Sequence, residues 1–386
     1  MYTILQLACT TRKRLLFVVF AGLLSLAPAA KAQTWNWTTE DIDLEGYGTS
    51  IVADQVGNLH ASYYFATGGL VKYAFRAAGS SKWYKMAIEE KLGVLDTKIT
   101  LDAANNPSIC YTPRIMKYAS WNGRKWTKQE VDPGTGLISY ICSIEVSPDG
   151  KPMMSWYLES GTYFRFAILQ DGVWVARSIE GGDGLPGKWN SMALDSKGHP
   201  RLAYSHFPLG HLKYASFDGQ RWTISMVDAA DNRPGGSGQR GMGNSLVLDA
   251  RGNPLISYYT EQSIKFAKYV NGQWKNEVVE ELPPFGKWSW KNFRSSLVLD
   301  SEGNPHIGFE SLRGLEHAWW DGKQWHTQML VPCVGISFFE NAMTIDKNDT
   351  LYVTYRDPAD GTLKIATGRS ASVAHTPDVA KGSPLN

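Results

Sequence analysis

A single pattern of about fifty residues recurs seven times along the chain, and it restricts the fold more than any other feature. Its clearest copy begins at Asn244 and reads "NSLVLDARGNPLISYYTEQSIKFAKYVNGQWKNEVVE". Four short runs of β-branched and aromatic residues are separated there by Gly, Asn, Pro and Asp, which favour tight turns. Each copy is therefore predicted to form four antiparallel strands.

The copies align on a residue that closes the first run of each. These positions are Asp54, Asp102, Ser147, Asp195, Asp249, Asp300 and Asp346, spaced by roughly 45 to 54 residues. Such a period is typical of one blade of a propeller. We predict an all-β, seven-bladed β-propeller with four-stranded blades. Gly150, Gly252 and Gly303, in the turns after this residue, are expected at positive φ.

The last blade lacks a fourth run, and the missing piece stands at the other end of the propeller. Six fourth runs open on a tryptophan: Trp83, Trp126, Trp174, Trp222, Trp274 and Trp325. "WNWTTEDID" (Trp35 to Asp43) matches "RKWTKQEVD" (Arg124 to Asp132), with Trp37 at the place of Trp126. We predict that this N-terminal segment closes the last blade, since an open ring would leave unpaired strand edges.

The two ends of the chain read differently from the repeats. Arg12, Lys13 and Arg14 precede the apolar run "LLFVVFAGLLSLA", and Ala30-Lys31-Ala32 offers small residues for cleavage. Residues 1–32 are predicted to be a signal peptide, too short and wrongly flanked for a stable membrane span. Residues 33–369 would form the propeller, and residues 370–386 a disordered tail. We expect a secreted or periplasmic protein without a membrane span.

Charge and cysteine content exclude several classes of protein. The formal net charge is +2, which argues against nucleic acid as a partner. After the signal peptide only Cys110, Cys142 and Cys333 remain, so at most one disulfide can form. No spacing of Cys and His matches a zinc site. We expect a monomer without a metal or a cofactor.

The repeat "D-x-x-G-N-P-x-I-S-Y-Y … L-K-Y-A-x-W-x-G-x-x-W" resembles that of secreted bacterial propellers with BNR or sialidase-like repeats. The resemblance covers essentially the whole mature chain and implies the propeller fold. The Asp-box Ser-x-Asp-x-Gly-x-x-Trp is not reproduced, and "SPDGKPMMSW" (Ser147 to Trp156) matches it only in part. The arginine triad and nucleophilic tyrosine of sialidases have no matching motif, so the resemblance assigns no catalytic residue.

Candidate ligand-binding residues come from the loops in which the copies differ. Strand alternation places the connections between second and third strands, and those between blades, at one rim, here called the variable rim. Its long connectors are residues 181–189, 229–243 and 281–294. Tryptophan stacks on sugar faces and arginine pairs with carboxylates or sulfates. We expect ligand contacts from Trp189, Trp288, Trp290, Arg294, Glu310 and Arg313.

Acid–base chemistry is expected from the fourth blade. Its rim loop "SHFPLGH" carries His206 and His211 close to Tyr204, and Arg240 lies on the next connector. Histidine or tyrosine can move protons beside an arginine that holds an anion. These four residues are the candidate catalytic group. The alternative is that the aromatic residues pack in the core and that the histidines are merely solvated.

The first strands provide one further candidate. Most begin with a small residue: Ser50, Ser143, Ser191, Ser245, Ser296 and Ala342. Blade two has Lys98 at this place, and Glu145 lies two positions further on in blade three. These two residues either form a local ion pair near the central channel or make a charged channel mouth that contacts a ligand.

Three functional hypotheses remain open at this level. The first is a glycan-binding or glycan-processing propeller with one site on the variable rim near blades four to six. The second is an enzyme, a polysaccharide lyase or glycosidase that uses His or Tyr together with Arg. The third is a protein-interaction scaffold. A polysaccharide or other glycan is the expected partner.

Overall fold

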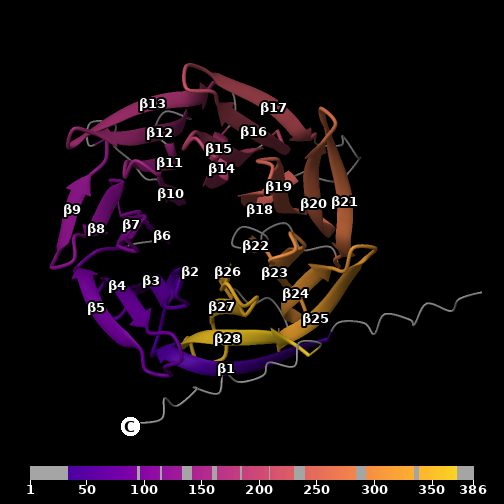
Figure 1. Cartoon of the computed structure of the whole chain (residues 1–386), viewed down its shortest axis with the longest axis horizontal. Coiled ribbons are helices and arrows are strands. Elements are labelled where there is room, and N and C mark those ends of the chain that lie inside the picture. The colour runs from indigo at the N-terminus through magenta and orange to yellow at the C-terminus, as the bar shows by residue number, and fades with distance from the viewer. Residues whose placement is uncertain are drawn as a thin grey trace, which may run out of the picture. The chain divides into compact units, whose positions relative to one another are not determined.

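The computed structural model describes residues 34–93, 96–113, 115–132, 141–158, 163–182, 185–207, 209–229, 240–283, 293–333 and 339–371. The predicted signal peptide and residues 372–386 lie outside this part. The described strands form seven antiparallel four-stranded sheets, which follow one another around a ring (Figure 1). The first strand of each sheet lies nearest the centre and the last lies outside. The predicted seven-bladed β-propeller is confirmed.

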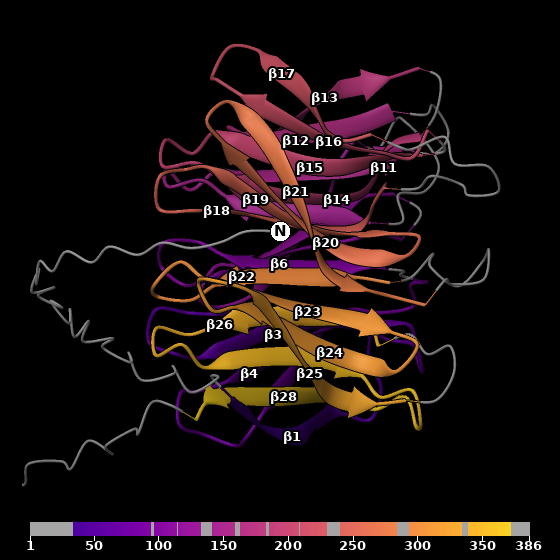
Figure 2. The same cartoon turned by 90° about the vertical axis from the view of Figure 1, so that its right-hand side faces the viewer.

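The strands of blades one to three are β2–β5 (Tyr47–Ala53, Leu59–Phe65, Leu70–Arg76, Tyr84–Glu89), β6–β9 (Thr97–Leu101, Pro107–Tyr111, Lys117–Trp121, Trp126–Glu130) and β10–β13 (Cys142–Val146, Pro152–Leu158, Tyr163–Gln170, Val173–Gly181). Blades four to six are β14–β17 (Leu185–Leu194, Pro200–Phe207, His211–Phe217, Trp222–Asp228), β18–β21 (Arg240–Leu248, Pro254–Thr260, Ser263–Val270, Gln273–Glu281) and β22–β25 (Ser295–Leu299, Pro305–Ser311, Gly314–Trp320, Trp325–Pro332). Blade seven is β26–β28 (Ala342–Ile345, Leu351–Arg356, Leu363–Ser370) with β1 (Trp35–Asp43). Seen from the side, the outer strands β21 and β25 run steeply across the inner strands, as the twist of each sheet requires (Figure 2).

The last blade closes as the sequence predicts. Strand β1 pairs antiparallel with β28, from Trp35 opposite Ser370 to Asp43 opposite Leu363. Indigo β1 and yellow β28 lie side by side in Figure 1. The ring is therefore closed by hydrogen bonds between the first and last strands of the chain.

The repeated aspartate shapes the turn between the first two strands of a blade. In blade five, Asp249 Oδ1 accepts hydrogen bonds from the backbone N–H groups of Arg251 and Asn253, and Oδ2 accepts one from Asn253 Nδ2. Asp54, Asp102 and Asp300 bind their turns in the same way. Such bonds satisfy turn amides that no strand partner reaches. The aspartates thus have a structural role.

The predicted positive φ of three turn glycines is confirmed, with 80° at both Gly150 and Gly252 and 85° at Gly303. Replacing Gly252 by alanine should lower the free energy of unfolding by about 1 kcal/mol, because a Cβ disfavours this conformation although nothing lies within 4 Å of its place. Urea unfolding measures the change. Gly93→Ala is the control, since Gly93 is not at positive φ and also faces open space. Equal effects of the two substitutions would contradict the explanation.

The repeated tryptophans join neighbouring blades. All but Trp83 pack edge-on against an aromatic ring on the third strand of the preceding blade, with ring centroids 5.2–5.3 Å apart. The Trp83 ring instead lies under the guanidinium of Arg76 in its own blade. The pairs are Trp126–Tyr73, Trp174–Tyr118, Trp222–Phe166, Trp274–Tyr214, Trp325–Phe266 and, across the closing blade, Trp37–His317. Such edge-to-face contacts stabilise beyond the apolar area they bury. A repeated set of aromatic side chains thus joins neighbouring blades.

A second repeated contact holds the blades together nearer the variable rim. A carboxylate at the end of one outer strand accepts hydrogen bonds from a tyrosine and a lysine of the next blade. Asp43 is bound by Tyr63 and Lys72, and Glu89 by Tyr111 and Lys117. Glu180 is bound by Tyr204 and Lys213, and Asp228 by Tyr258 and Lys265. These charge-assisted bonds recur with the blades and therefore serve the fold.

Candidate functional site

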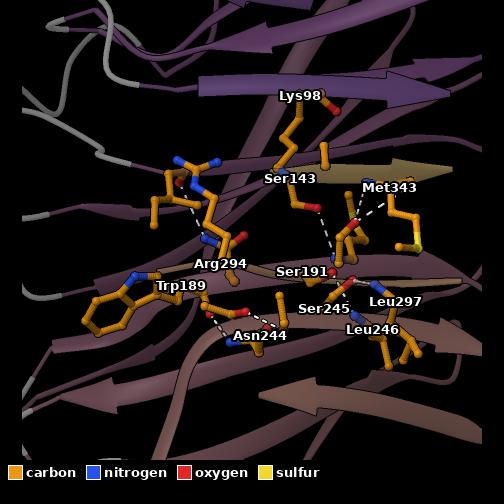
Figure 3. A pocket seen from close by; sticks show the side chains of 18 of the residues that line it. Lys98, Ser143, Trp189, Ser191, Asn244, Ser245, Leu246, Arg294, Leu297 and Met343 are labelled. Carbon is orange, nitrogen blue, oxygen red and sulfur yellow. Dashed lines mark hydrogen bonds between the residues drawn. The ribbon is translucent and has the colours of Figure 1, made fainter. Parts of the chain in front are cut away.

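The inner strands surround a channel that contains a cavity of about 200 Å³. Its lining includes the seven equivalent positions of the inner strands, here called the ring positions: Ser50, Lys98, Ser143, Ser191, Ser245, Ser296 and Ala342. Figure 3 shows Lys98, Arg294 and Trp189 around the same space as Ser143, Ser191 and Ser245. The residue two places before each ring position, towards the variable rim, forms the channel mouth. The mouth residues are Gly48, Asp96, Ile141, Trp189, Gly243, Arg294 and Glu340.

The serines of the ring positions bind neighbouring blades to each other. Each hydroxyl oxygen accepts the N–H of the residue that follows the ring position of the next blade, at 2.7–3.3 Å. The five pairs are Ser50–Ile99, Ser143–Met192, Ser191–Leu246, Ser245–Leu297 and Ser296–Met343. An inner strand has no further strand beside it, so these bonds satisfy amides that would otherwise lack a partner.

Lys98 interrupts this series at the junction of blades two and three. No side chain among the described residues accepts the N–H of Ile144, which serines accept at the matching place in five other blades. At the same junction a disulfide joins Cys110 to Cys142. In other blades the matching positions are joined by hydrogen bonds, as between Ser62 and Thr97 or Ser257 and Ser295. A covalent link therefore stands where the serine contact is lost.

The mouth of the channel carries a buried ion pair between distant blades. Arg294 Nη1 donates a 2.6 Å hydrogen bond to Asp96 Oδ1, and the Asp96 carboxylate is fully buried. Glu340 accepts a hydrogen bond from the backbone N–H of Gly48. Both Glu340 and Glu310 lie close enough to act electrostatically on Arg294. The guanidinium is thus hydrogen-bonded to the carboxylate of Asp96 in blade two and lies near the carboxyl groups of Glu310 in blade six and Glu340 in blade seven.

Glu310 lies behind this mouth and has no exposed surface. Its carboxylate accepts hydrogen bonds from the N–H groups of Phe339 and Asn341 and from Asn341 Nδ2, at 3.2–3.4 Å. Burial raises the pKa of Glu310 to about 8, against the effect of these donors. The structure thus places Glu310 in a buried hydrogen-bond network with Asn341, whose Nδ2 also donates to the backbone carbonyl of Arg294.

Two titratable groups line the cavity itself. Burial lowers the pKa of Lys98 to about 8; Asp96 opposes the shift and Arg294 adds to it. Burial raises the pKa of Glu145 to about 7, and a 3.1 Å hydrogen bond from Thr100 opposes that shift. The ion pair considered between Lys98 and Glu145 does not form within 4 Å in the described part of the chain. The structure instead agrees with a charged channel.

Trp189 lines the cavity but is only 4% exposed. Its neighbours in one apolar cluster include Met242, Phe293 and Leu297, and its φ is 47°. Lys188 lies over its ring, with the ammonium nitrogen 5.2 Å from the centroid. The sequence suggested an exposed loop residue, whereas the structure gives Trp189 a large packing role at the edge of the mouth.

The four candidate catalytic residues lie outside the cavity lining. The phenolic hydroxyl of Tyr204 donates a 2.6 Å hydrogen bond to the Glu180 carboxylate. Tyr63, Tyr111 and Tyr258 make the same inter-blade contact. His206 lies opposite His211 in the register of β15 and β16. The Nδ1 atom of His206 is 3.9 Å from Glu180 Oε1. Arg240 Nε is 3.7 Å from Asp228.

These environments bear on proton transfer. Burial lowers the pKa of His211, and His206 and Lys213 contribute to the shift, so its imidazole is neutral near pH 7. Burial and the Glu180 carboxylate raise the pKa of Tyr204, so its phenol stays protonated. Of the two, only His211 has the protonation state that a base requires.

Of the remaining predicted residues, one lies at the variable rim and two lie outside the described residues. Arg313 is half exposed and forms ion pairs with Glu316 and Glu280. Trp288 and Trp290 lie outside the described residues. Of the residues predicted from sequence, the structure brings Lys98, Trp189 and Arg294 to one cavity, and Glu310 is not part of its lining.

Sequence reasoning missed Asp96, Glu340 and the polar residues that precede the ring positions. Asn190, Asn244 and Asn341 donate side-chain hydrogen bonds to carbonyls of the preceding blade's mouth residues. A signal for them was present, because the position before each ring position reads Thr49, Thr97, Cys142, Asn190, Asn244, Ser295 and Asn341. Small polar residues and a cysteine at one repeated place indicate a shared inter-blade contact.

Among the described residues no group of three or more His, Cys, Asp or Glu side chains is arranged to hold a metal ion. The described part also has no helix that is long and apolar enough to span a membrane.

Comparison with known proteins identifies the fold. No protein-family model and no curated protein matches the sequence. Among solved structures, AofleA of Arthrobotrys oligospora is 14% identical, with a TM-score of 0.53 over 78% of this chain and 94% of its own. The fucose-specific lectin of Aleuria aurantia is also 14% identical, with a TM-score of 0.50 over 76% and 97%.

A PL25 ulvan lyase, solved with bound -[GlcA(1-4)Rha3S]-, is 10% identical, with a TM-score of 0.61 over 85% of this chain and 95% of its own. At such low identity these likenesses carry the fold and no more. The chain shares its β-propeller fold with a fucose-specific lectin and with a polysaccharide lyase.

Proposed function

We propose that this protein binds a glycan at the variable-rim mouth of its central channel. The observation that carries the proposal is the cavity lined by serine hydroxyls, side-chain amides, Lys98, Arg294 and the edge of Trp189. Saccharides present many hydroxyl groups around small apolar faces, so they need convergent donors and acceptors beside an aromatic surface. The channel offers both.

The size of the cavity limits what enters it. At about 200 Å³ it is smaller than the roughly 300–1,000 Å³ of pockets that enclose drug-sized ligands. It would therefore take one sugar unit or its charged substituent, while the rest of the chain lies on the variable rim. A single site of this kind differs from a lectin with one equivalent site in each blade.

Two further observations support the proposal. Structures with this fold include a fucose-specific lectin and a polysaccharide lyase, so the scaffold is used for saccharides elsewhere. The disulfide between Cys110 and Cys142 is compatible with an oxidising compartment, where secreted glycan-binding proteins work. Secretion through the predicted signal peptide belongs to the same proposal.

The enzyme alternative rests on different residues. A lyase or glycosidase would need His211, with its lowered pKa, as a base near an arginine such as Arg240. The Tyr204 phenol is already engaged with Glu180, in a contact that three other blades repeat. Binding without turnover is therefore the simpler assignment. The scaffold alternative would require binding of a protein partner and of no saccharide.

Filling the cavity tests the proposed site. Ala342 lines it at the one ring position with a small apolar side chain and is 5% exposed. Ala342→Leu should weaken glycan binding by about 10-fold or more, equivalent to ~1.4 kcal/mol, because the larger side chain takes the ligand's space. Overpacking should cost about 1–3 kcal/mol of stability. Affinity gels with a polysaccharide panel and calorimetry measure binding, and thermal melting measures the fold.

Ala250→Leu is the matched control, because Ala250 is exposed in the turn between β18 and β19, at the rim opposite the variable one. It adds the same volume outside the cavity and should bind as the parent does. Equal affinity of the two variants would place the site elsewhere. Release of unsaturated uronate, followed by absorbance and lost in His211→Ala, would favour the lyase. No retardation and no product with any polysaccharide would favour the scaffold.

A further inference from the structure

We infer that the cavity recognises an oxyanion substituent of the glycan, a carboxylate or a sulfate, and that Lys98 is its main charged contact. This inference rests on the proposed glycan site and names the chemistry that the site selects. It comes from three observations: the interrupted ring, the unpaired ammonium and the neighbouring guanidinium.

The first observation is that Lys98 takes a place where a small residue serves the fold. Five ring positions carry serines that accept an N–H of the next blade. With a lysine at this position, the backbone N–H of Ile144 has no serine hydroxyl to donate to, and the Cys110–Cys142 disulfide joins the same two blades instead. A residue that breaks a structural rule beside a compensating link has the pattern expected of a functional residue.

The second observation is that the Lys98 ammonium has no counter-ion. No hydrogen bond or ion pair joins its Nζ to another described residue, although the side chain is half buried and lines the cavity. A buried charge is normally paired, because leaving water costs free energy that a partner must offset. An anion in the cavity would supply this partner.

The third observation is the arrangement of charges around Lys98. Arg294 lines the same cavity, and its charge disfavours the ammonium form of Lys98. Asp96, which favours that form, is already bound by Arg294 through a 2.6 Å hydrogen bond. Two cations that destabilise one another in one cavity are the arrangement that a bound anion stabilises. The charge of Arg294 is already paired with the Asp96 carboxylate. Lys98 is therefore the cation of the two that lacks a paired carboxylate.

The pH dependence of binding follows from the groups that face Lys98. Among the described residues these are Glu145 on β10, which lines the same cavity, and Asp96 before β6 and Arg294 before β22, which act on Lys98 electrostatically. Glu340 before β26 acts on Arg294 and Asp96. Without ligand the pKa of Lys98 is about 8, and a bound anion raises this pKa. At a pH near or above 8 the anion therefore binds together with a proton, and its affinity falls as the pH rises. Glu145, with a pKa of about 7, becomes neutral at lower pH and ceases to repel the anion. Affinity should therefore be highest near pH 6 and fall through pH 8.

Matched saccharides separate the anion from the sugar. The probes are oligogalacturonate with its methyl ester, and a sulfated carrageenan oligosaccharide, whose backbone carries no carboxylate, with its desulfated form. Calorimetry should show the full chain binding one charged member about 10- to 100-fold more tightly than its uncharged match, the range of one charge-assisted hydrogen bond. A difference within the oligogalacturonate pair identifies the anion as a carboxylate, and a difference within the sulfated pair identifies it as a sulfate.

Lys98→Met should remove this preference, whereas Lys323→Met should keep it, because Lys323 is exposed in a turn at the other rim. Lys98→Ser is the second variant, and it should also lose the preference. It should at the same time raise Tm by about 1–3 °C, because the serine hydroxyl can accept the Ile144 N–H as the other ring serines do. A variant that is more stable but binds charged and uncharged saccharides equally cannot be explained by misfolding.

The outcomes distinguish this inference from the function on which it rests. Equal binding of charged and uncharged saccharides, or a preference that survives Lys98→Ser, overturns the inference but leaves glycan binding in place. Binding of charged saccharides that grows stronger from pH 6 to pH 9 also overturns it. Absence of binding to every saccharide overturns the proposed function itself.

Discussion

Removal of residues 33–43 is expected to unfold the propeller or to make it aggregate near room temperature. Strand β1 is the outer strand of blade seven, and its loss would expose the whole edge of β28 from Leu363 to Ser370. An unpaired, unprotected edge is a template for pairing with another chain. The ring would also lose the contacts by which its two ends hold each other.

The core contribution of β1 sets the size of this effect. Trp35 and Ile42 are each 3% exposed, and Trp35 packs against His306 and His317 of blade six. Removing a buried Trp side chain costs about 3–5 kcal/mol and a buried Ile about 2–5 kcal/mol. The two together reach a large part of the roughly 5–15 kcal/mol by which a native protein is stable.

Polar contacts at the end of β1 add to this loss. Asp43 accepts hydrogen bonds from Tyr63, Lys72 and Lys85 of blade one. Without Asp43 a buried tyrosine and a lysine would lack their partner, which is more costly than loss of the bond alone. Thermal melting and size-exclusion chromatography measure the result. Removal of residues 376–386, from the tail predicted to be disordered, is the matched control, and a truncated protein lacking residues 33–43 that melts like the parent would refute ring closure.

Reduction of the Cys110–Cys142 disulfide is expected to lower the free energy of unfolding by about 3–4 kcal/mol, from the loop entropy of a link between residues 32 apart in sequence. The effect should be larger than for an ordinary surface disulfide, because the same junction lacks the serine contact present at five others. Denaturant unfolding with and without reductant measures it.

Two double variants separate the covalent link from the polar contact that it replaces. Cys110→Ser with Cys142→Thr recreates the pair found between Ser62 and Thr97, which are 2.9 Å apart. It should recover about 0.5–1.5 kcal/mol relative to the variant with alanine at both positions. Cys333→Ser is the control for loss of a thiol. Equal stability of the reduced and oxidised proteins would show that the link is dispensable.

Much of the fold could be predicted because the repeat encodes it locally. The aspartate turns, the turn glycines and the place of β1 each depend on residues that recur at fixed offsets, so copies confirm one another. The contacts between blades were harder to predict. Tyr204 looked like a catalytic candidate from its neighbours His206 and His211, although its counterparts Tyr63, Tyr111 and Tyr258 indicate a shared structural contact.

The site could be predicted only in part, because its residues come from strands far apart in sequence. Lys98 was singled out as an exception to a run of small residues, and the structure places it in the cavity. Its relation to Arg294 and Asp96 could not be read from the sequence, since these two residues are 198 positions apart. Trp189 combines both difficulties, because a tryptophan beside glycine and lysine reads as a loop residue but packs in the core.

The central claim is that a saccharide occupies the channel beside Lys98, and protection from chemical labelling tests it most directly. The protein is treated near pH 8 with an amine-reactive reagent, with and without the best-binding oligosaccharide, and labelling is quantified at each lysine by peptide mass spectrometry. We predict that the saccharide lowers labelling of Lys98 severalfold and leaves exposed Lys323 unchanged. Labelling of Lys98 that is the same with and without a bound saccharide would contradict the account.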